Sequence, residues 1–363
     1  MPRAGSAGAA ALFPALARAL VAAFIAAFIA ALVALWAQPV RAQAGAPPVK
    51  EAVKESLAPA QAQQWLARIH QAARAGNYQG TLVYSADGVL SSSSVWHFVV
   101  GDQSYERLES LDGRQRRIVR HNEVVHTLWP QTKVAVLERR ETLAAWSTTP
   151  QAVDPQALEH YEVQREGSTR VAGRAAAVLM LAPRDALRYA QRVWADQTTG
   201  LMLRADVLGD ASAGVRPVLE STAFSEVDVQ VKPQPEQVLL LMRQLDGYQV
   251  LRPQQKRTSL AAEGWLLQRP VPGFSLAGVL RRGMDTAGDG EPVLQTVFTD
   301  GLTHVSVFVE PHKPQRHGAD MQARQGATTA LMMRRGEYWV TAVGNVPPAT
   351  LKLFAAAIER QRP

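Results

Sequence analysis

The sequence contains no cysteine among its 363 residues. Disulfide bonds and thiolate metal sites are therefore excluded, and an apolar core has to hold the fold together. The chain also lacks a glycine-rich phosphate loop, which argues against a nucleotide-binding enzyme. Asp and Glu are missing from residues 1–44, although they occur throughout the rest of the chain. The first segment therefore differs in charge from everything that follows it.

Residues 1–44 have the pattern of a secretory signal peptide. Two arginines precede an uninterrupted apolar run at 19–37, and the small-x-small sequence Ala42-Gln43-Ala44 follows it. We expect cleavage after Ala44 and export of the remaining chain. The apolar run is nearly as long as a membrane-spanning helix, so an uncleaved membrane anchor is the alternative. Without a cysteine at the cleavage site, lipoprotein processing is excluded.

The charge of the exported chain bears on its partners. Removal of residues 1–44 takes away three arginines and lowers the formal net charge from +7 to +4. A mildly basic surface on an exported protein suits anionic lipid head groups or an acidic protein segment. Nucleic acid is not expected as a partner of such a protein.

The pattern beyond residue 60 predicts one helix followed by a large antiparallel sheet. Residues 45–60 are rich in Pro and Ala and are expected to form a mobile leader. Between residues 62 and 75, apolar side chains recur at helical spacing. From Tyr78 to Val227, about ten short β-rich runs alternate with tight turns such as Asp87-Gly88. A curved sheet covered by the early helix is the expected N-terminal domain, over residues 61–228.

The second half of the chain predicts a smaller domain after a linker. Prolines and charged residues interrupt residues 229–262, which indicates a linker, and the apolar residues 238–245 within it predict a short helix. Residues 263–363 contain strand patterns and end in a helix that starts at Pro347-Pro348. The predicted fold class is therefore α+β, with a large curved half-barrel sheet and a small C-terminal α+β domain.

The clearest candidate for an anion-binding site is a cluster of four arginines: Arg114, Arg116, Arg117 and Arg120. In an extended strand, Arg114, Arg116 and Arg120 would share one face and Arg117 would lie on the other. Arginine on a rigid strand can bind phosphate or carboxylate with two hydrogen bonds, which suits a lipid phosphate or an acidic peptide. The alternative is that these charges solvate an outer face or protect an edge strand.

Aromatic residues offer a candidate apolar cavity. They come from separate strands or strand ends: Trp96, Phe98, Trp129, Trp146 and Trp194. On the inner side of the curved sheet they would line a cavity for acyl chains. Ordinary core packing is the alternative, because the helix at 62–75 has to cover part of the same face. Trp96 and Phe98 share one face, so His97 is expected to point outward.

No arrangement of residues in the sequence favours an enzyme or a metal site. His312 and His317 lie in a proline-rich loop without further ligands nearby, which is poor spacing for zinc. The serines from Ser91 to Ser94 lack the context of a catalytic nucleophile, and the aspartates show no paired arrangement for acid–base chemistry. We therefore expect a binding protein that needs no cofactor.

Short sequence blocks in both halves of the chain carry a family resemblance. In the N-terminal half the blocks are YQGTLVY at 78–84, ERLESLDG at 106–113, RIVRHNEV at 117–124 and WADQTTGLMLR at 194–204. In the C-terminal half they are Trp265, PGF at 272–274, TDGL at 299–302, VSVFVE at 305–310 and GNVPPAT at 344–350. Each block alone is ordinary strand-and-turn sequence. In their common order from Trp65 to Ile358, interrupted at the linker, they resemble the RseB/MucB family, whose members are periplasmic regulators of the sigma-E envelope-stress response.

The resemblance implies a large N-terminal domain shaped like the lipoprotein carriers LolA and LolB, and a smaller C-terminal domain. It implies a periplasmic negative regulator that binds the periplasmic domain of a membrane anti-sigma factor of the RseA or MucA type and shields it from proteolysis. Lipopolysaccharide or mislocalised lipoprotein is expected to release it. The alternative is a periplasmic carrier of lipoproteins or lipids, which would need only the first domain. An envelope hydrolase is the least favoured class, and a homo-oligomer is left open.

Overall fold

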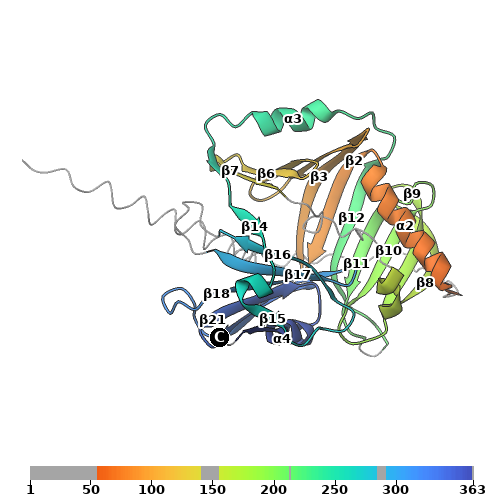
Figure 1. The fold of residues 1–363 in the computed structure, drawn as a ribbon. Coiled ribbons are helices and arrows are strands. Elements are labelled where there is room, and N and C mark those ends of the chain that lie inside the picture. Colours follow the sequence, from red (N-terminus) through yellow and green to blue (C-terminus); the bar gives the residue numbers. More distant parts are fainter. Residues whose placement is uncertain (1–54, 140–154, 212–213, 284–291, 362–363) are drawn as a thin grey trace, which may run out of the picture.

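The computed structural model describes residues 55–139, 155–211, 214–283 and 292–361. The predicted signal peptide at 1–44, most of the leader at 45–60, and Trp146 therefore lie outside the described residues. The described chain forms two large sheets with helices packed on them (Figure 1). Within these residues no helix is both long enough and apolar enough to cross a membrane.

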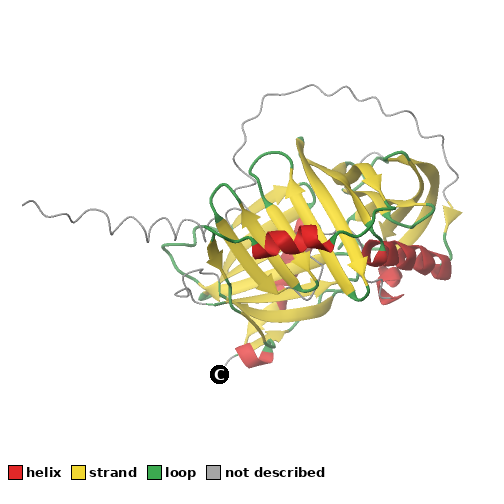
Figure 2. Cartoon of the chain, turned by 90° about the horizontal axis from the view of Figure 1, so that it is seen from above, coloured by secondary structure: helices red, strands yellow, loops and turns green. Residues whose placement is uncertain are grey.

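A curved sheet of 13 strands makes up the N-terminal half (Figures 1 and 2). Its strands lie side by side in the order β1-β8-β9-β10-β11-β12-β2-β3-β4-β5-β6-β7-β13, and all neighbours are antiparallel except β7 and β13. The strands are β1 (Glu55–Ser56), β2 (Tyr78–Ala86), β3 (Val89–Val100), β4 (Gln103–Ser110), β5 (Arg117–His121), β6 (Val124–Trp129), β7 (Val134–Arg139), β8 (Tyr161–Val171), β9 (Arg174–Pro183), β10 (Ala190–Asp196), β11 (Met202–Leu208), β12 (Val218–Asp228) and β13 (Gln249–Leu251). The predicted large antiparallel sheet is confirmed.

Tight turns set the register of this sheet. Asp87 and Gly88, which join β2 to β3, both have positive φ, at 48° and 77°. A two-residue hairpin needs this backbone conformation, and Asp and Gly adopt it at low energetic cost. The turn brings Ala86 opposite Val89 and thereby fixes every later pair of the two strands.

Helix α2 (Pro59–Ala75) packs on the inner side of the curved sheet (Figure 1). Pro59 occupies the first helical turn, where its missing N–H is not needed. Leu66 and Ile69 are fully buried and pack in one cluster with Leu179 and Val193 of the sheet. Burial of each of these side chains contributes about 1.5–3 kcal/mol, which fixes the helix on the sheet.

Helix α3 (Pro235–Arg243) lies on the opposite, outer face of the same sheet. Its Val238 is buried in one cluster with Phe98 and Val119. Successive residues of a strand lie on opposite faces of the sheet. The pairing from β10 through β11, β12 and β2 to β3 places His97 on the same face as Val193. Phe98, the next residue, therefore lies on the opposite face. The two helices therefore cover opposite faces of one sheet.

The C-terminal half contains a second sheet of seven strands in the order β14-β16-β17-β18-β21-β20-β19, next to a two-stranded sheet of β15 and β22. These strands are β14 (Gln255–Arg257), β15 (Trp265–Leu267), β16 (Ser275–Arg282), β17 (Val293–Thr299), β18 (His304–Pro311), β19 (Met321–Gln325), β20 (Thr328–Arg335), β21 (Tyr338–Gly344) and β22 (Ile358–Arg360). Helix α4 (Pro348–Ala357) covers this sheet with Leu351 and Phe354, which are fully buried. The sequence pattern missed β14, β16, β19 and β22.

The segment at 229–262 takes part in both halves of the molecule. It supplies α3 to the outer face of the large sheet, β13 to its edge beside β7, and β14 to the edge of the second sheet. The sequence pattern predicted only a linker with a helix here, because three-residue strands are too short to show alternation.

Among the described residues, three buried carboxylates make polar contacts between the two halves. They are Glu138 with Arg282, Glu220 with Ala327 and Asn345, and Asp300 with Tyr161 and Arg188. Each carboxylate pairs with donors from the other half of the chain. The arrangement of the two sheets is therefore specified by directional polar contacts as well as by apolar packing.

Candidate functional site

The structure separates the four arginines that the sequence places close together. Strand β5 begins at Arg117, so Arg114 and Arg116 precede it and are exposed. Arg117 and Arg120 lie on opposite faces of the strand, opposite Glu109 and Glu106 of β4. The predicted common face of Arg114, Arg116 and Arg120 is therefore not formed, because only Arg120 of the three belongs to the strand.

Arg120 is held within the fold. Its Nη1 atom lies 3.5 Å from Oε2 of Glu106, and its Nε donates a hydrogen bond to the carbonyl of Asn122. The side chain is only 11% exposed. These contacts leave little of the Arg120 guanidinium for an external anion.

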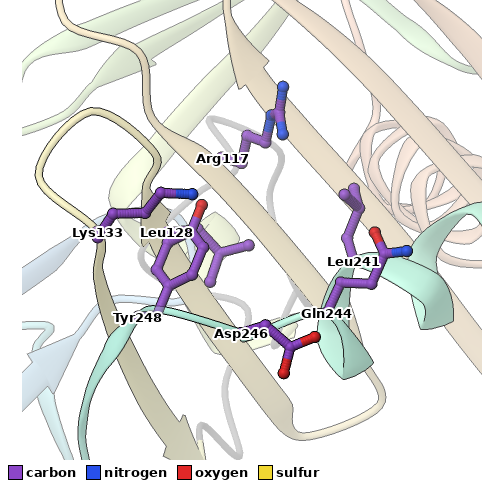
Figure 3. A pocket seen from close by; sticks show the side chains of 7 residues that line it. All are labelled: Arg117, Leu128, Lys133, Leu241, Gln244, Asp246 and Tyr248. Atoms are coloured by element: carbon purple, nitrogen blue, oxygen red, sulfur yellow. The ribbon is translucent and has the colours of Figure 1, made fainter.

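Arg117 is the member of the cluster that lines a groove on the outer face, shown in Figure 3. The groove has a volume of about 280 Å³ and lies between strands β5–β7 and the end of α3 with the turn after it. Its lining residues are Arg117, Leu128, Lys133, Leu241, Gln244, Asp246 and Tyr248. Two cations, one carboxylate and several apolar groups therefore surround one small space.

The backbone around Lys133 explains how distant residues meet at this groove. Lys133 lies in the turn between β6 and β7 with φ of 52°, and its carbonyl accepts a hydrogen bond of 2.7 Å from the N–H of Gln249. Its Nζ atom lies 4.9 Å from the centroid of the Tyr248 ring. No sequence pattern indicates Lys133 and Tyr248 as site residues, because only the parallel pairing of β13 with β7 brings them together.

The charge of Arg117 is partly balanced from the sheet. Its Nε atom lies 2.6 Å from Oε1 of Glu109, and Arg107 forms a second ion pair with the same carboxylate. Burial would raise the pKa of Glu109, but hydrogen bonds and charges from Arg107 and Arg117 outweigh it and lower that pKa. Glu109 is therefore ionised, and the three residues together carry one net positive charge.

The aromatic residues of the predicted cavity are divided among different parts of the molecule. Trp96 and Phe98 belong to the cluster beneath α3, on the outer face. Phe98 is 1% exposed, and the guanidinium of Arg107 lies 4.5 Å from the centroid of the Trp96 ring. These two residues thus pack as core on the face opposite to the predicted one.

Trp194 lies in another cluster, with Leu203 and Phe224, and Arg204 lies 4.5 Å from the centroid of its ring. Trp129 is half-buried at the end of β6. The prediction for Trp146 falls outside the described residues. The structure therefore does not bring Trp96 and Trp194 together around one cavity.

His97 is buried on the inner face, and the expectation that it points outward is wrong. Its Nδ1 atom lies 2.7 Å from the carbonyl oxygen of Gly76, and its ring stacks on Tyr78 at 5.0 Å. Alternation correctly placed His97 opposite to Phe98. It carried no information on which face is the inner one.

His312 and His317 lie in one aromatic cluster with Trp339 on the C-terminal sheet. Their ring centroids are 5.6 Å apart, and His317 stacks parallel to Trp339 at 4.9 Å. Burial lowers the pKa of His317 to about 4. In the described part of the chain, no group of three or more His, Cys, Asp or Glu side chains is arranged to hold a metal ion.

The chain matches two family models in order. The MucB/RseB N-terminal domain matches residues 61–242, and the MucB/RseB C-terminal domain matches residues 259–359. The sigma factor AlgU regulatory protein MucB of Pseudomonas aeruginosa is 30% identical over 308 residues, which cover 82% of this chain and 91% of that protein. The sigma-E factor regulatory protein RseB of Escherichia coli K12 is 24% identical, over 81% of this chain and 89% of that protein.

Solved structures share the same fold. A chain in the complex of Pseudomonas aeruginosa MucA and MucB has a TM-score of 0.62 and 28% identity, and covers 84% of this chain and 100% of its own length. MucB in complex with MucA(peri) gives a TM-score of 0.60 at 28% identity, over 83% of this chain and 99% of that chain. The curved sheet and the second domain thus agree with this family in both sequence and fold. The chain belongs to the MucB/RseB family of sigma factor regulatory proteins.

Proposed function

We propose that the protein is a periplasmic negative regulator of an envelope-stress sigma factor. After removal of residues 1–44, it binds the periplasmic domain of a membrane anti-sigma factor of the MucA or RseA type and shields that domain from proteolysis. Lipopolysaccharide or mislocalised lipoprotein releases it. The protein binds its ligands without catalysing a reaction.

One observation carries this proposal. The similarity to MucB, which has been solved in complex with MucA, extends over both domains of the chain. A lipid carrier would need only the first domain, whereas this chain keeps the second domain and joins it to the first by polar contacts of buried carboxylates. These features favour a regulator over a carrier.

Release by a lipid requires that the two ligands compete or stabilise different conformations. If lipid binding weakens binding of the anti-sigma factor, the anti-sigma factor must weaken binding of the lipid by the same factor. A lipid without a preference for one conformation would not release the partner. This reciprocity can be measured in either direction.

The test is a calorimetric titration of the protein, purified from residue 45 onward, with the periplasmic domain of the anti-sigma factor from the same organism. A matched control is an unrelated soluble protein of similar net charge. We expect saturable binding of the anti-sigma domain only. In a second assay, the protease that cleaves the periplasmic domain of the anti-sigma factor should cut the bound domain more slowly than the free one.

Two outcomes would contradict the proposal. Absence of saturable binding would show that the anti-sigma domain is not the partner. Binding with an unchanged cleavage rate would show that the protein binds this domain without protecting it from proteolysis. A titration repeated with lipopolysaccharide present should give a weaker apparent affinity, and an unchanged affinity would remove lipopolysaccharide as the releasing ligand.

A further inference from the structure

The groove between α3 and strands β5–β7 lies on the outer face of the large sheet, away from the inner face that α2 covers. The sheet supplies Arg117, Leu128 and Lys133 to the groove. The segment after α3 supplies Gln244 and Tyr248. Because both walls belong to folded elements, the groove has a defined shape before any ligand arrives.

The groove carries an excess positive charge. Arg117 shares Glu109 with Arg107, so this group contributes one net positive charge. Lys133 contributes a second, and within the described residues no carboxylate forms an ion pair with it. Asp246 cancels one charge overall, but in Figure 3 its carboxylate points away from Arg117 and Lys133. The charge that remains matches one carboxylate of a ligand.

The other lining side chains are apolar or can form hydrogen bonds. Leu128 and Leu241 lie on opposite walls, and the Tyr248 ring lies beside the Lys133 ammonium group at 4.9 Å. An apolar ligand group bound there would contact Leu128 and Leu241 while its carboxylate reaches the cations. The Gln244 amide is a further donor and acceptor at the edge of the groove.

The size of the groove limits its ligand. About 280 Å³ is slightly below the range of about 300–1,000 Å³ that is common for pockets that enclose drug-sized ligands. A lipid with several acyl chains is much larger than this space. A short peptide segment fits the volume and combines a carboxylate with an apolar side chain.

We propose that this groove binds a peptide segment that presents one carboxylate beside an apolar side chain. The carboxylate lies between Arg117 and Lys133, and the apolar side chain lies between Leu128 and Leu241. The carboxylate belongs to a chain terminus or to an acidic side chain. The inference rests on the proposed function for its natural ligand, since an acidic segment of the anti-sigma factor supplies the peptide.

The test uses three short peptides against the whole exported chain. Acetyl-Ala-Ala-Leu with a free terminus carries a terminal carboxylate, its C-terminal amide carries none, and acetyl-Ala-Glu-Leu-Ala-amide carries an internal one. Binding is followed by nuclear magnetic resonance titration. We expect binding of at least one carboxylate peptide and none of the uncharged amide, and the peptide that binds more tightly identifies the source of the carboxylate.

Two substitutions separate charge from shape. Lys133→Asn removes the charge and keeps a residue that tolerates positive φ, whereas Gln244→Trp fills the groove from an exposed position without changing charge. Each should weaken binding of the carboxylate peptide about tenfold or more. The matched control is Lys352→Glu on α4, at an exposed site in the other domain, which should leave the affinity unchanged. Thermal melts establish that all three variants are folded.

The outcomes distinguish this inference from the proposed function. If no carboxylate peptide binds, or if Lys133→Asn and Gln244→Trp bind as well as the unchanged protein, the groove is not the site. If the anti-sigma domain still binds in that case, the proposed function stands without the groove. If the peptides bind in the expected manner and the anti-sigma domain does not bind, the groove stands and the proposed function fails.

Discussion

Arg188 Nε donates a hydrogen bond of 2.8 Å to Oδ2 of Asp300, and both side chains are completely inaccessible to solvent. Arg188 lies between β9 and β10 of the large sheet, and Asp300 follows β17 of the second sheet. The same Asp300 oxygen accepts a hydrogen bond of 2.8 Å from the hydroxyl of Tyr161. Arg188 also pairs with Asp185 and donates to the carbonyl of Pro272 at 2.9 Å. One buried arginine therefore joins the two halves of the molecule.

Asp300→Asn should destabilise the protein by about 3–5 kcal/mol, because it leaves part of the charge of Arg188 without its buried partner. The asparagine can keep the Oδ1 acceptor that serves the N–H groups of Leu302 and Thr303, so the local turn is retained. Urea unfolding gives the free energy. The control is Glu123→Gln, which breaks an exposed ion pair with Arg139 and should change stability by less than about 1 kcal/mol. Equal losses in the two variants would contradict a dominant role for the buried pair.

Gly273→Ala should be more destabilising than Gly336→Ala, although both glycines have positive φ, at 71° and 62°. In both, the added methyl group introduces left-handed strain of about 1–2 kcal/mol. At Gly273 the new Cβ would also lie 2.5 Å from Nε2 of His160 and collide with the Arg188 guanidinium, whereas nothing lies within 4 Å at Gly336. The measurement is the difference between the two midpoints in urea. Identical midpoints would show that the His160 and Arg188 side chains move away from the added methyl group without loss of stability.

Glu220 should make stability depend on pH. Burial raises the pKa of its carboxyl, although hydrogen bonds from Ala327, Tyr84 and Asn345 act in the opposite direction. A carboxyl with a raised pKa in the folded state stabilises the fold below its ordinary pKa, and this contribution is lost as pH rises through the raised value. The side chain of Glu220→Gln stays neutral at every pH. The stability of the unchanged protein relative to this variant should therefore fall as pH rises from the ordinary pKa of Glu to the raised pKa of Glu220.

This pH effect is measured by urea unfolding of both proteins at several pH values. Asp196 and Glu109 have lowered pKa values and act in the opposite sense, since their contribution is lost as pH falls. They are present in both proteins, so the difference between the two curves isolates Glu220. Curves that stay parallel from pH 4 to about pH 8 would rule out a raised pKa.

The N-terminus of the exported protein should be Gly45, because the cleavage pattern ends at Ala44. The protein should then be released from cells by osmotic shock. Intact-mass measurement of the purified protein decides the matter. A mass that includes residues 1–44 would indicate the membrane-anchored alternative.

Limited trypsin digestion should cut first within 229–262, where Lys232, Arg243 and Lys256 are exposed. The contacts between the halves should keep the two fragments together after this cut. Size-exclusion chromatography should therefore show one peak that contains both fragments. An earlier cut within residues 78–227 would contradict the predicted domain boundary, and separate peaks would contradict a stable interface.

Much of the fold follows from local features of the sequence. Alternation and tight turns such as Asp87-Gly88 predicted most strands of the large sheet, because a turn of two residues forces antiparallel neighbours. The spacing of Leu66 and Ile69 predicted α2, since only a helix places them on one face. The ordered sequence blocks identified the family without any structure.

Tertiary structure decided everything that depends on which distant segments meet. Alternation showed that Trp96 and Phe98 share a face, but only the packing of α3 shows that this face is the outer one. The pairing of Lys133 with Tyr248 arises because β13 returns to the edge of the sheet and runs parallel to β7. The sequence by itself determined the elements, because hydrogen bonding and side-chain alternation are local. It did not determine the site, because a site is formed by residues whose proximity depends on the register and curvature of the whole sheet.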